Sequence, residues 1–149
     1  MAFAVLEYGA ECWLLPGWKQ CGAGGGMGYV SWLGVALIIL GEGIRKTGMV
    51  TARSNFTHNI RVQQSDAHSL VTHGIYRYIR HPGYLGWYVW CIGTQVLLCN
   101  PASCVAFAVV AWRFFRGRIQ YEEYFLRRFF GAEYDEYAAR TPTWIPLIP

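Results

Sequence analysis

A stretch without a single charged residue runs from Gln20 to Gly41, and it limits what this chain can fold into. Its densest part, residues 27–40, is almost wholly apolar. About 20 consecutive apolar residues are enough for a helix to cross the hydrocarbon layer of a bilayer. Charged side chains return at Glu42 and would mark the exit from that layer. The sequence therefore predicts a transmembrane helix over about residues 27–46.

The composition also favours a membrane protein. Of the 149 residues, 54% are hydrophobic and only 15% are charged, whereas soluble domains average about 25% charged residues. A single core of this size cannot bury so much apolar surface, so lipid is the expected solvent for part of it. The basic residues, net charge +4, are separated by long apolar segments, and this pattern argues against a nucleic-acid partner. The five cysteines form no Cys-x-x-Cys pair and are interpreted as packing residues.

A second apolar region, residues 84–115, is interrupted only at Cys99-Asn100-Pro101. It predicts a helical hairpin, with arms of about residues 82–98 and 101–117, that crosses the membrane and returns. A buried hairpin in a soluble core is the alternative. The first helix, about residues 1–15, is apolar but carries Glu7 and Glu11 on one face. Such a helix is expected to turn that face toward partner helices.

From Arg113 onward the pattern becomes amphipathic, which predicts a helix that ends at Gly131. The segment 142–149 holds three prolines and is expected to be irregular. Almost all basic residues lie beside the same helix ends, which the positive-inside rule places in the cytosol. The polar segment of about residues 50–83 and the tail 118–149 would then share one compartment. The predicted fold is one all-α integral membrane domain, residues 1–149, with transmembrane helices, a helical hairpin and a cytosolic C-terminal amphipathic helix.

Two places in the sequence could carry chemistry. Arg118 and Glu122 share a helix face, either as a surface ion pair or as ligand contacts. An arginine fork suits a carboxylate, and a glutamate suits ribose hydroxyls or a cation. His81 precedes Pro82 at the start of the hairpin, where unpaired amide groups favour an anion. The histidines are too widely spaced for a recognised zinc motif, so no metal site is predicted.

Several motifs together resemble the C-terminal part of the isoprenylcysteine carboxyl methyltransferase family. The resemblance covers nearly the whole chain and is most specific in the middle segment and at the hairpin turn. The matching motifs are Gly41-Glu42-x-x-Arg45-Lys46, Ser54-Asn55-Phe56-x-His58, Ser65-Asp66-x-His68-x-Leu70-Val71-Thr72, Gly74-x-Tyr76, Arg80-His81-Pro82-x-Tyr84-x-Gly86-Trp87, Ile92-Gly93-Thr94-Gln95, Leu98-Cys99-Asn100-Pro101, Trp112-Arg113-Phe114-Phe115-x-x-Arg118 and Glu122-Glu123.

The resemblance implies a reaction and a site. S-adenosylmethionine would donate a methyl group to the C-terminal carboxylate of a prenylated cysteine in CaaX-processed proteins, at the cytosolic face of the endoplasmic reticulum membrane. Arg118 would hold the substrate carboxylate, as the catalytic and substrate-binding residue. The cofactor would be bound by Arg61, His68, Ser69, Leu70, Val71, Tyr76, His81, Pro82, Gly83, Tyr84 and Glu122. Arg61 stands where the animal members have a cofactor-contacting glutamine.

Two other functions are compatible with these residues. A methyltransferase of phospholipid amines shares the Arg-His-Pro core, although an amine substrate needs no arginine fork. The animal members of the family carry additional N-terminal membrane helices, and this chain begins near the last few of them. A non-catalytic truncated membrane adaptor is therefore the other alternative, and it would not bind the cofactor.

Overall fold

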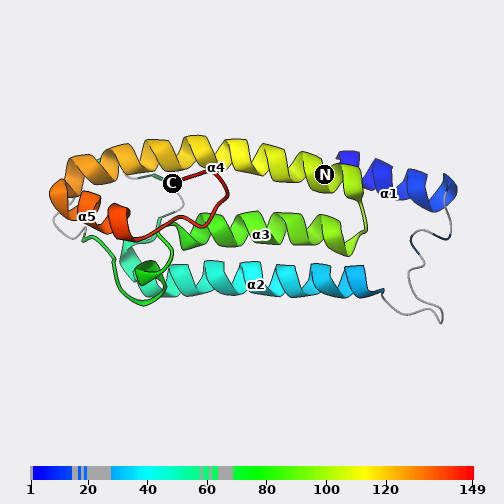
Figure 1. Cartoon of the computed structure of the whole chain (residues 1–149), viewed down its shortest axis with the longest axis horizontal. Coiled ribbons are helices and arrows are strands. Elements are labelled where there is room, and N and C mark those ends of the chain that lie inside the picture. Colours follow the sequence, from blue (N-terminus) through cyan, green and yellow to red (C-terminus); the bar gives the residue numbers. More distant parts are fainter. Residues whose placement is uncertain are drawn as a thin grey trace. The chain divides into compact units, whose positions relative to one another are not determined.

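The structure, a computed structural model, describes residues 2–14, 17, 19, 28–57, 59–60, 62–63 and 69–149. Within this part of the chain the regular structure is entirely helical (Figure 1), which confirms the predicted all-α class. The α-helices are α1 (Ala2–Leu14), α2 (Tyr29–Ala52), α3 (Pro82–Leu97), α4 (Pro101–Phe130) and α5 (Ala132–Arg140). Two short 3-10 helices, η1 (Arg53–Asn55) and η2 (Gly74–Arg77), lie in the polar middle segment.

The helix bounds follow from local sequence signals. Both α3 and α4 begin at a proline, which favours the first helical position because the missing amide would be unpaired there. Helix α4 contains the second hairpin arm and the amphipathic tail, which the sequence presented as two elements. It is continuous because no proline interrupts it before Gly131, where φ is 54°. Gly131 thus ends the helix as predicted, and residues 142–149 are non-helical, also as predicted.

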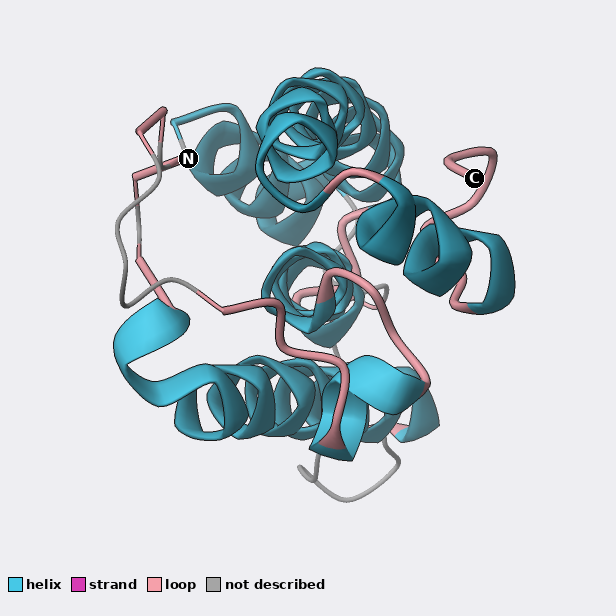
Figure 2. Cartoon of the chain, turned by 90° about the vertical axis from the view of Figure 1, so that its left-hand side faces the viewer, coloured by secondary structure: helices cyan, strands magenta, loops and turns pink. Residues whose placement is uncertain are grey.

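The chain divides into two compact units. Unit 1 comprises Met1–Glu42 and Trp87–Ala111, and unit 2 comprises Gly43–Gly86 and Trp112–Pro149. In unit 1, α3 lies between α2 and α4 (Figure 2). Helices α2 and α3 approach closely at two glycines, because a Cβ atom at Gly34 would lie 2.2 Å from the Leu97 nitrogen, and one at Gly93 would lie 2.9 Å from the Ile38 nitrogen.

This close approach gives a test of the packing in unit 1. Gly34→Ala is expected to destabilise the protein by about 1–3 kcal/mol, since the added methyl group meets backbone that must move. Gly43→Ala is the matched control on the same helix, because a Cβ at Gly43 has no neighbour within 4 Å. There alanine should be neutral or stabilise by up to about 1 kcal/mol. Thermal unfolding of the purified variants measures both effects, and equal stabilities would contradict the packing.

Polar side chains of the N-terminal segment hold the turn between α3 and α4. The Glu7 carboxylate accepts hydrogen bonds from the first amides of α4, those of Ala102 and Ser103, at 2.8 and 2.7 Å. Asn100 donates to the Ala4 carbonyl at 3.0 Å and accepts from Lys19 at 2.7 Å. A carboxylate at a helix N-terminus pairs unbonded amides and complements the helix dipole. The polar face of α1 therefore packs on partner residues of unit 1, as the sequence predicted.

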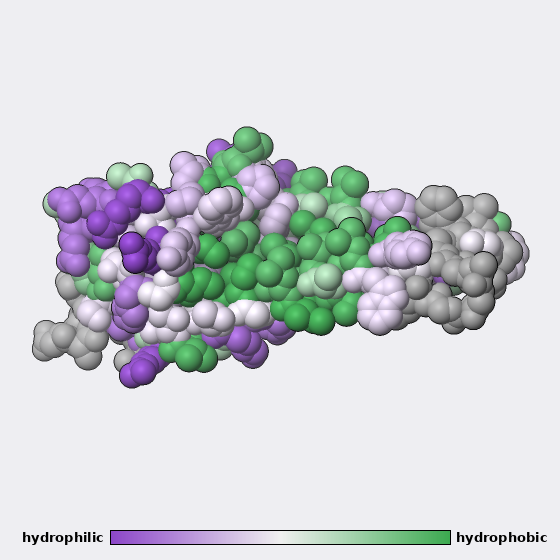
Figure 3. Space-filling model, turned by 60° about the horizontal axis from the view of Figure 1, so that its bottom comes forward, coloured by the Kyte–Doolittle hydropathy of each residue, from purple (hydrophilic) through white to green (hydrophobic). Residues whose placement is uncertain are grey.

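Large apolar side chains are exposed along α1 and α2. Helix α2 alone presents Tyr29, Val30, Trp32, Leu33, Ile39 and Leu40. The face of the molecule drawn in Figure 3 carries a broad hydrophobic area. None of the helices among the described residues combines the length and the apolar character that crossing a membrane requires.

Candidate active site in unit 2

A buried carboxylate lies on the apolar face of α4. Phe115, Ile119 and Glu123 follow one another at a spacing of four residues, and their exposed fractions are 3%, 2% and 7%. Residues at this spacing share one face of a helix. Glu123 therefore continues an apolar stripe into the interior of unit 2, where a charge is tolerated only if it is paired.

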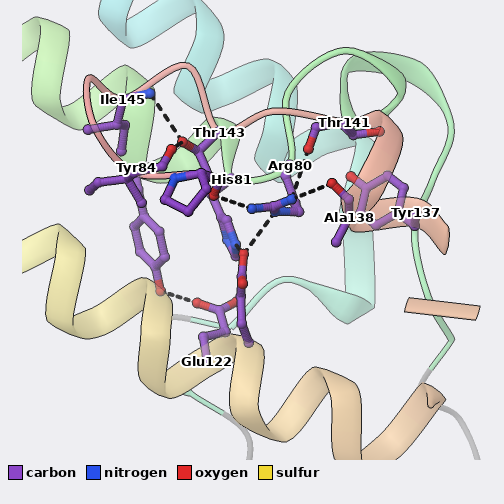
Figure 4. A network of polar contacts seen from close by, with 12 residues as sticks. Arg80, His81, Tyr84, Glu122, Tyr137, Ala138, Thr141, Thr143 and Ile145 are labelled. Carbon is purple, nitrogen blue, oxygen red and sulfur yellow. Dashed lines mark hydrogen bonds and ion pairs between the residues drawn. The ribbon is translucent and has the colours of Figure 1, made fainter. Parts of the chain in front are cut away.

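Glu123 is paired with three basic side chains, two of which, Arg80 and His81, are labelled in Figure 4. Its Oε1 atom lies 2.8 Å from Arg80 Nε and 3.2 Å from His81 Nε2. Its Oε2 atom accepts a hydrogen bond from the Arg127 guanidinium at 3.2 Å, and Arg127 also donates to Asp135 at 3.1 Å. A carboxylate thus contacts the ring of His81, directly before α3, whereas the sequence predicted that an anion would be favoured at the amide groups there.

Arg80 also ties the segment after α5 to the site. Its guanidinium donates to the carbonyl oxygens of Ala138 at 2.7 Å and Thr141 at 3.0 Å, and to that of Pro149. Its backbone amide donates to the Pro142 carbonyl at 3.0 Å. The side chain is buried and its bonds are made inside unit 2. Arg80 therefore acts as a structural link and holds the backbone around His81 in place.

Burial by itself would raise the pKa of Glu123. The hydrogen bond with His81 and the charges of Arg80 and Arg127 outweigh that cost and hold the pKa below its ordinary value of 4.5. The folded state therefore favours the ionised carboxylate. By linkage, the stability that it contributes is fully present above pH 4.5 and is lost as the pH falls through the lowered folded-state pKa.

The pH dependence of stability tests this network. We expect the difference in unfolding free energy between the wild-type protein and Glu123→Gln to be largest at neutral pH. The difference should shrink as the pH falls below 4.5, because the wild-type carboxylate then takes up a proton while glutamine does not titrate. Chemical unfolding at a series of pH values measures it. A difference that stays constant down to strongly acidic pH would contradict the assignment.

Beside this network, one hydroxyl group joins the two residues that the sequence selected on α4. Tyr84, on the first turn of α3, donates a hydrogen bond to the Glu122 carboxylate. The same hydroxyl accepts a hydrogen bond from Arg118 Nε at 3.0 Å, and the Arg118 guanidinium lies over the Tyr84 ring at 5.6 Å. Arg118 and Glu122 are therefore linked through Tyr84, and the arrangement is more specific than a surface ion pair.

Two further aromatic contacts complete the site. The His81 ring stacks on Tyr84 at 5.6 Å, and Tyr84 packs on Phe115 at 5.3 Å. Tyr76, in η2, is close enough to Glu122 to respond to its charge, because burial first and the Glu122 charge second raise the pKa of Tyr76 to about 12. The Tyr137 hydroxyl donates to the Tyr76 carbonyl at 2.7 Å and fixes η2 against α5.

The remaining predicted site residues that the structure describes make other contacts. Ser69 pairs with Asn55, which donates to its hydroxyl at 3.2 Å and accepts from its amide at 3.3 Å. Leu70 and Val71 are half-buried and lie in the non-helical segment before η2. Pro82 packs on α2, since a Cβ at Gly48 would lie 2.8 Å from its ring, and Gly83 faces the Phe56 ring.

The predicted cofactor residues Arg61 and His68 lie outside the described residues. Among the residues that are described, no three histidine, cysteine, aspartate or glutamate side chains are grouped so that they could hold a metal ion.

Sequence reasoning missed the roles of Arg80 and Glu123. Both belong to motifs quoted above, but only their neighbours His81 and Glu122 were given a function. The signal that identifies Glu123 is its spacing, because it lies four and eight residues after Ile119 and Phe115 on an apolar face. A carboxylate at such a position needs a buried basic partner, but the sequence does not show that this partner is Arg80.

Comparison with known proteins identifies the family. The model of the isoprenylcysteine carboxyl methyltransferase family matches residues 33–128. A probable protein-S-isoprenylcysteine O-methyltransferase of Oryza sativa subsp. indica is 51% identical over 99% of this chain and 74% of its own length. The human protein-S-isoprenylcysteine O-methyltransferase is 50% identical over 96% of this chain and 48% of its own length.

A solved structure of a eukaryotic intramembrane Ras methyltransferase, also an isoprenylcysteine carboxyl methyltransferase, has a TM-score of 0.92 and 40% sequence identity. It matches 99% of this chain and 50% of its own chain. The all-helical fold therefore matches that of an intramembrane methyltransferase. The chain belongs to the isoprenylcysteine carboxyl methyltransferase family, which confirms the resemblance seen in the sequence. It spans about three quarters of the rice relative and about half of the human relative and of the solved structure.

Proposed function

We propose that the chain catalyses methyl transfer from S-adenosylmethionine to the C-terminal carboxylate of a prenylated cysteine in CaaX-processed proteins. The observation that carries the proposal is the Tyr84 hydroxyl, which joins Arg118 to Glu122 beside the buried His81–Glu123 pair. Family membership gives the reaction, and this cluster supplies groups of the right kind. A carboxylate substrate is already ionised near neutral pH, so the site needs no general base.

The side chains present fit the cofactor. Its sulfur and its α-amino group are cationic, and the ribose carries hydroxyl groups. The Glu122 carboxylate can accept hydrogen bonds from the α-amino group or from the ribose hydroxyls, and the faces of Tyr76 and Tyr84 can stabilise a cation. Bound S-adenosylmethionine supplies an electrophilic methyl group. The full set of cofactor residues proposed from the family is Arg61, His68, Ser69, Leu70, Val71, Tyr76, His81, Pro82, Gly83, Tyr84 and Glu122.

Arg118 is proposed to hold the substrate carboxylate. A guanidinium can form two parallel hydrogen bonds to a carboxylate and so fix its orientation. The bond from its Nε atom to Tyr84 and the stacking on the tyrosine ring restrain the side chain before substrate arrives. The site's main contribution is then the alignment of two reactants, which can lower a reaction barrier by several kcal/mol.

We place this reaction at a membrane, since the prenyl group of the substrate is lipid-soluble and a related structure is described as intramembrane. The exposed apolar side chains of α1 and α2 would then face lipid or further helices. The proposed location, by analogy with the family, is the endoplasmic reticulum membrane, with several spans and with the site facing the cytosol. The clustering of arginines in unit 2 agrees with a cytosolic side.

A methylation assay tests the proposal. The purified chain in lipid is incubated with methyl-labelled S-adenosylmethionine and farnesylcysteine, and base-labile label in the product is counted. The expected product is a methyl ester. Cysteine without the prenyl group and an ethanolamine phospholipid serve as parallel acceptors. Label that appears only in the phospholipid would replace the proposal with amine methylation, and an absence of label in every acceptor would contradict it.

A further inference from the structure

An exposed aromatic patch lies in unit 2, apart from the Tyr84 cluster. We define it by Tyr78, Trp144 and Leu147, whose exposed fractions are 65%, 66% and 90%, together with the neighbouring Trp112. The Trp144 indole donates to the Tyr78 carbonyl at 2.9 Å. The Trp112 indole donates to the Pro146 carbonyl at 2.6 Å. The loop after α5, whose end is marked C in Figure 2, is thus fastened to Tyr78, directly after η2, and to Trp112, the residue at which α4 enters unit 2.

The backbone of this loop turns two apolar side chains outward. Ile145 and Ile148 are buried, and the Thr143 hydroxyl closes the loop by donating to the Ile148 carbonyl at 2.5 Å. Trp144 and Leu147, which directly precede these two residues, have positive φ angles of 62° and 59°. Side chains other than glycine rarely adopt this conformation. An open hollow of about 370 Å³ lies beside them, lined by Pro142, Trp144, Ile145, Pro146 and Ile148.

Two arginines border the patch and stack on its rings. The Arg116 guanidinium lies 5.3 Å from the Trp112 ring, and that of Arg77 lies 6.0 Å from the Tyr78 ring. Trp and Tyr, with an apolar ring and one polar atom, are typical of the membrane–water interface. Arginines beside them can reach the phosphates of anionic lipids. The combination of exposed apolar tips, anchored indoles and flanking positive charge matches a lipid surface better than a purely apolar protein partner.

We propose that this patch rests on the polar–apolar boundary of a phospholipid bilayer. Trp144 and Leu147 enter the acyl boundary, while Arg77 and Arg116 contact lipid phosphates. The inference rests on the membrane location given under the proposed function, and it goes beyond that function because it assigns a lipid contact to the loop after α5. The position of Trp112 supports placing the patch at the membrane–water boundary, since Trp112 lies near the end of the apolar part of α4. The loop would thereby set the height of unit 2 on the membrane.

Photocrosslinking tests the lipid contact directly. The photoreactive p-benzoylphenylalanine is placed at position 147 of the full chain, which is reconstituted into vesicles of phosphatidylcholine and phosphatidylserine. After irradiation, mass spectrometry identifies what is attached. We expect a phospholipid adduct at position 147 and at a second probe position, 144. The matched control is the probe at Glu136, on the exposed face of α5, where the lipid adduct should be lost.

Each other outcome overturns the inference. Lipid adducts at Glu136 equal to those at 147 would show that the labelling is non-specific. A crosslink to a second copy, or to farnesylcysteine in a parallel sample, with no lipid adduct would assign the patch to that occupant. The same vesicles are assayed for methyl transfer, so the two proposals are separable. Turnover without a lipid adduct would contradict only the proposed lipid contact. An adduct without turnover would contradict only the proposed reaction.

Discussion

Replacing Arg118 with alanine is expected to lower kcat/KM for farnesylcysteine by about 10- to 100-fold, while the affinity for S-adenosylhomocysteine changes little. A hydrogen bond to a charged partner is worth about 1.5–3 kcal/mol, which corresponds to this range. The variant should remain folded, because Arg118 is only part-buried and Glu123 with its partners is left intact. Initial rates at a series of farnesylcysteine concentrations measure the effect.

Two further variants serve as controls for Arg118→Ala. Arg118→Lys keeps the positive charge but loses the planar fork, so it should recover only part of the lost activity. Arg113→Ala removes an exposed arginine from the same helix and should leave kcat/KM unchanged. Full turnover in Arg118→Ala would refute the role of Arg118 in holding the substrate carboxylate.

The second large effect is on stability. Glu123→Ala removes the carboxylate that pairs with Arg80, His81 and Arg127. Arg80, only 7% exposed, is then left buried without its counter-ion. Removal of one partner of a buried ion pair destabilises proteins by about 3–5 kcal/mol. A clear fall in the thermal unfolding midpoint is therefore expected.

Controls separate this network from a general loss of charge. Glu136→Ala removes an exposed carboxylate from α5 and should change stability by no more than about 0.5 kcal/mol. Glu123→Gln keeps an acceptor for the basic side chains but loses the charge, so its stability should lie between wild type and Glu123→Ala. If Glu123→Ala costs no more than Glu136→Ala, the network does not stabilise unit 2.

The helices could largely be predicted because their signals are local. Pro82 and Pro101 mark helix starts, Gly131 marks an end, and the prolines after Thr141 prevent a further helix. The continuity of α4 was missed because the change from apolar to amphipathic pattern at Arg113 resembles a boundary. A helix backbone does not need to break where its surroundings change, and no breaker residue stands there.

Part of the candidate site also followed from the sequence. The pairing of Arg118 with Glu122 on one face of α4 is fixed by helix geometry, and family motifs added His81 and Tyr84. The hydroxyl bridge from Tyr84 and the network of basic side chains around Glu123 could not be predicted. They join residues in or just before the first turn of α3 to residues of α4 some 40 positions away, as in the contact between His81 and Glu123. Their partners depend on how the elements of unit 2 pack.

The same reasoning explains the loop after α5. Its prolines predict an irregular segment, but they do not show that Arg80 holds its carbonyl groups or that Trp112 donates to Pro146. These contacts are non-local. Through them, the segment after α5 packs as part of unit 2, which carries the site.

The central claim is that Tyr84 and Glu122 of unit 2 line the pocket for the methyl donor, while Arg118 beside them holds the substrate carboxylate. Calorimetric titration of S-adenosylhomocysteine into the purified chain, and into Glu122→Gln and Arg118→Ala, tests it most directly. The account predicts saturable one-to-one binding by wild type, clearly weaker binding by Glu122→Gln and near wild-type binding by Arg118→Ala. Absence of binding to the folded wild-type chain, or equal affinity for wild type and Glu122→Gln, would contradict it.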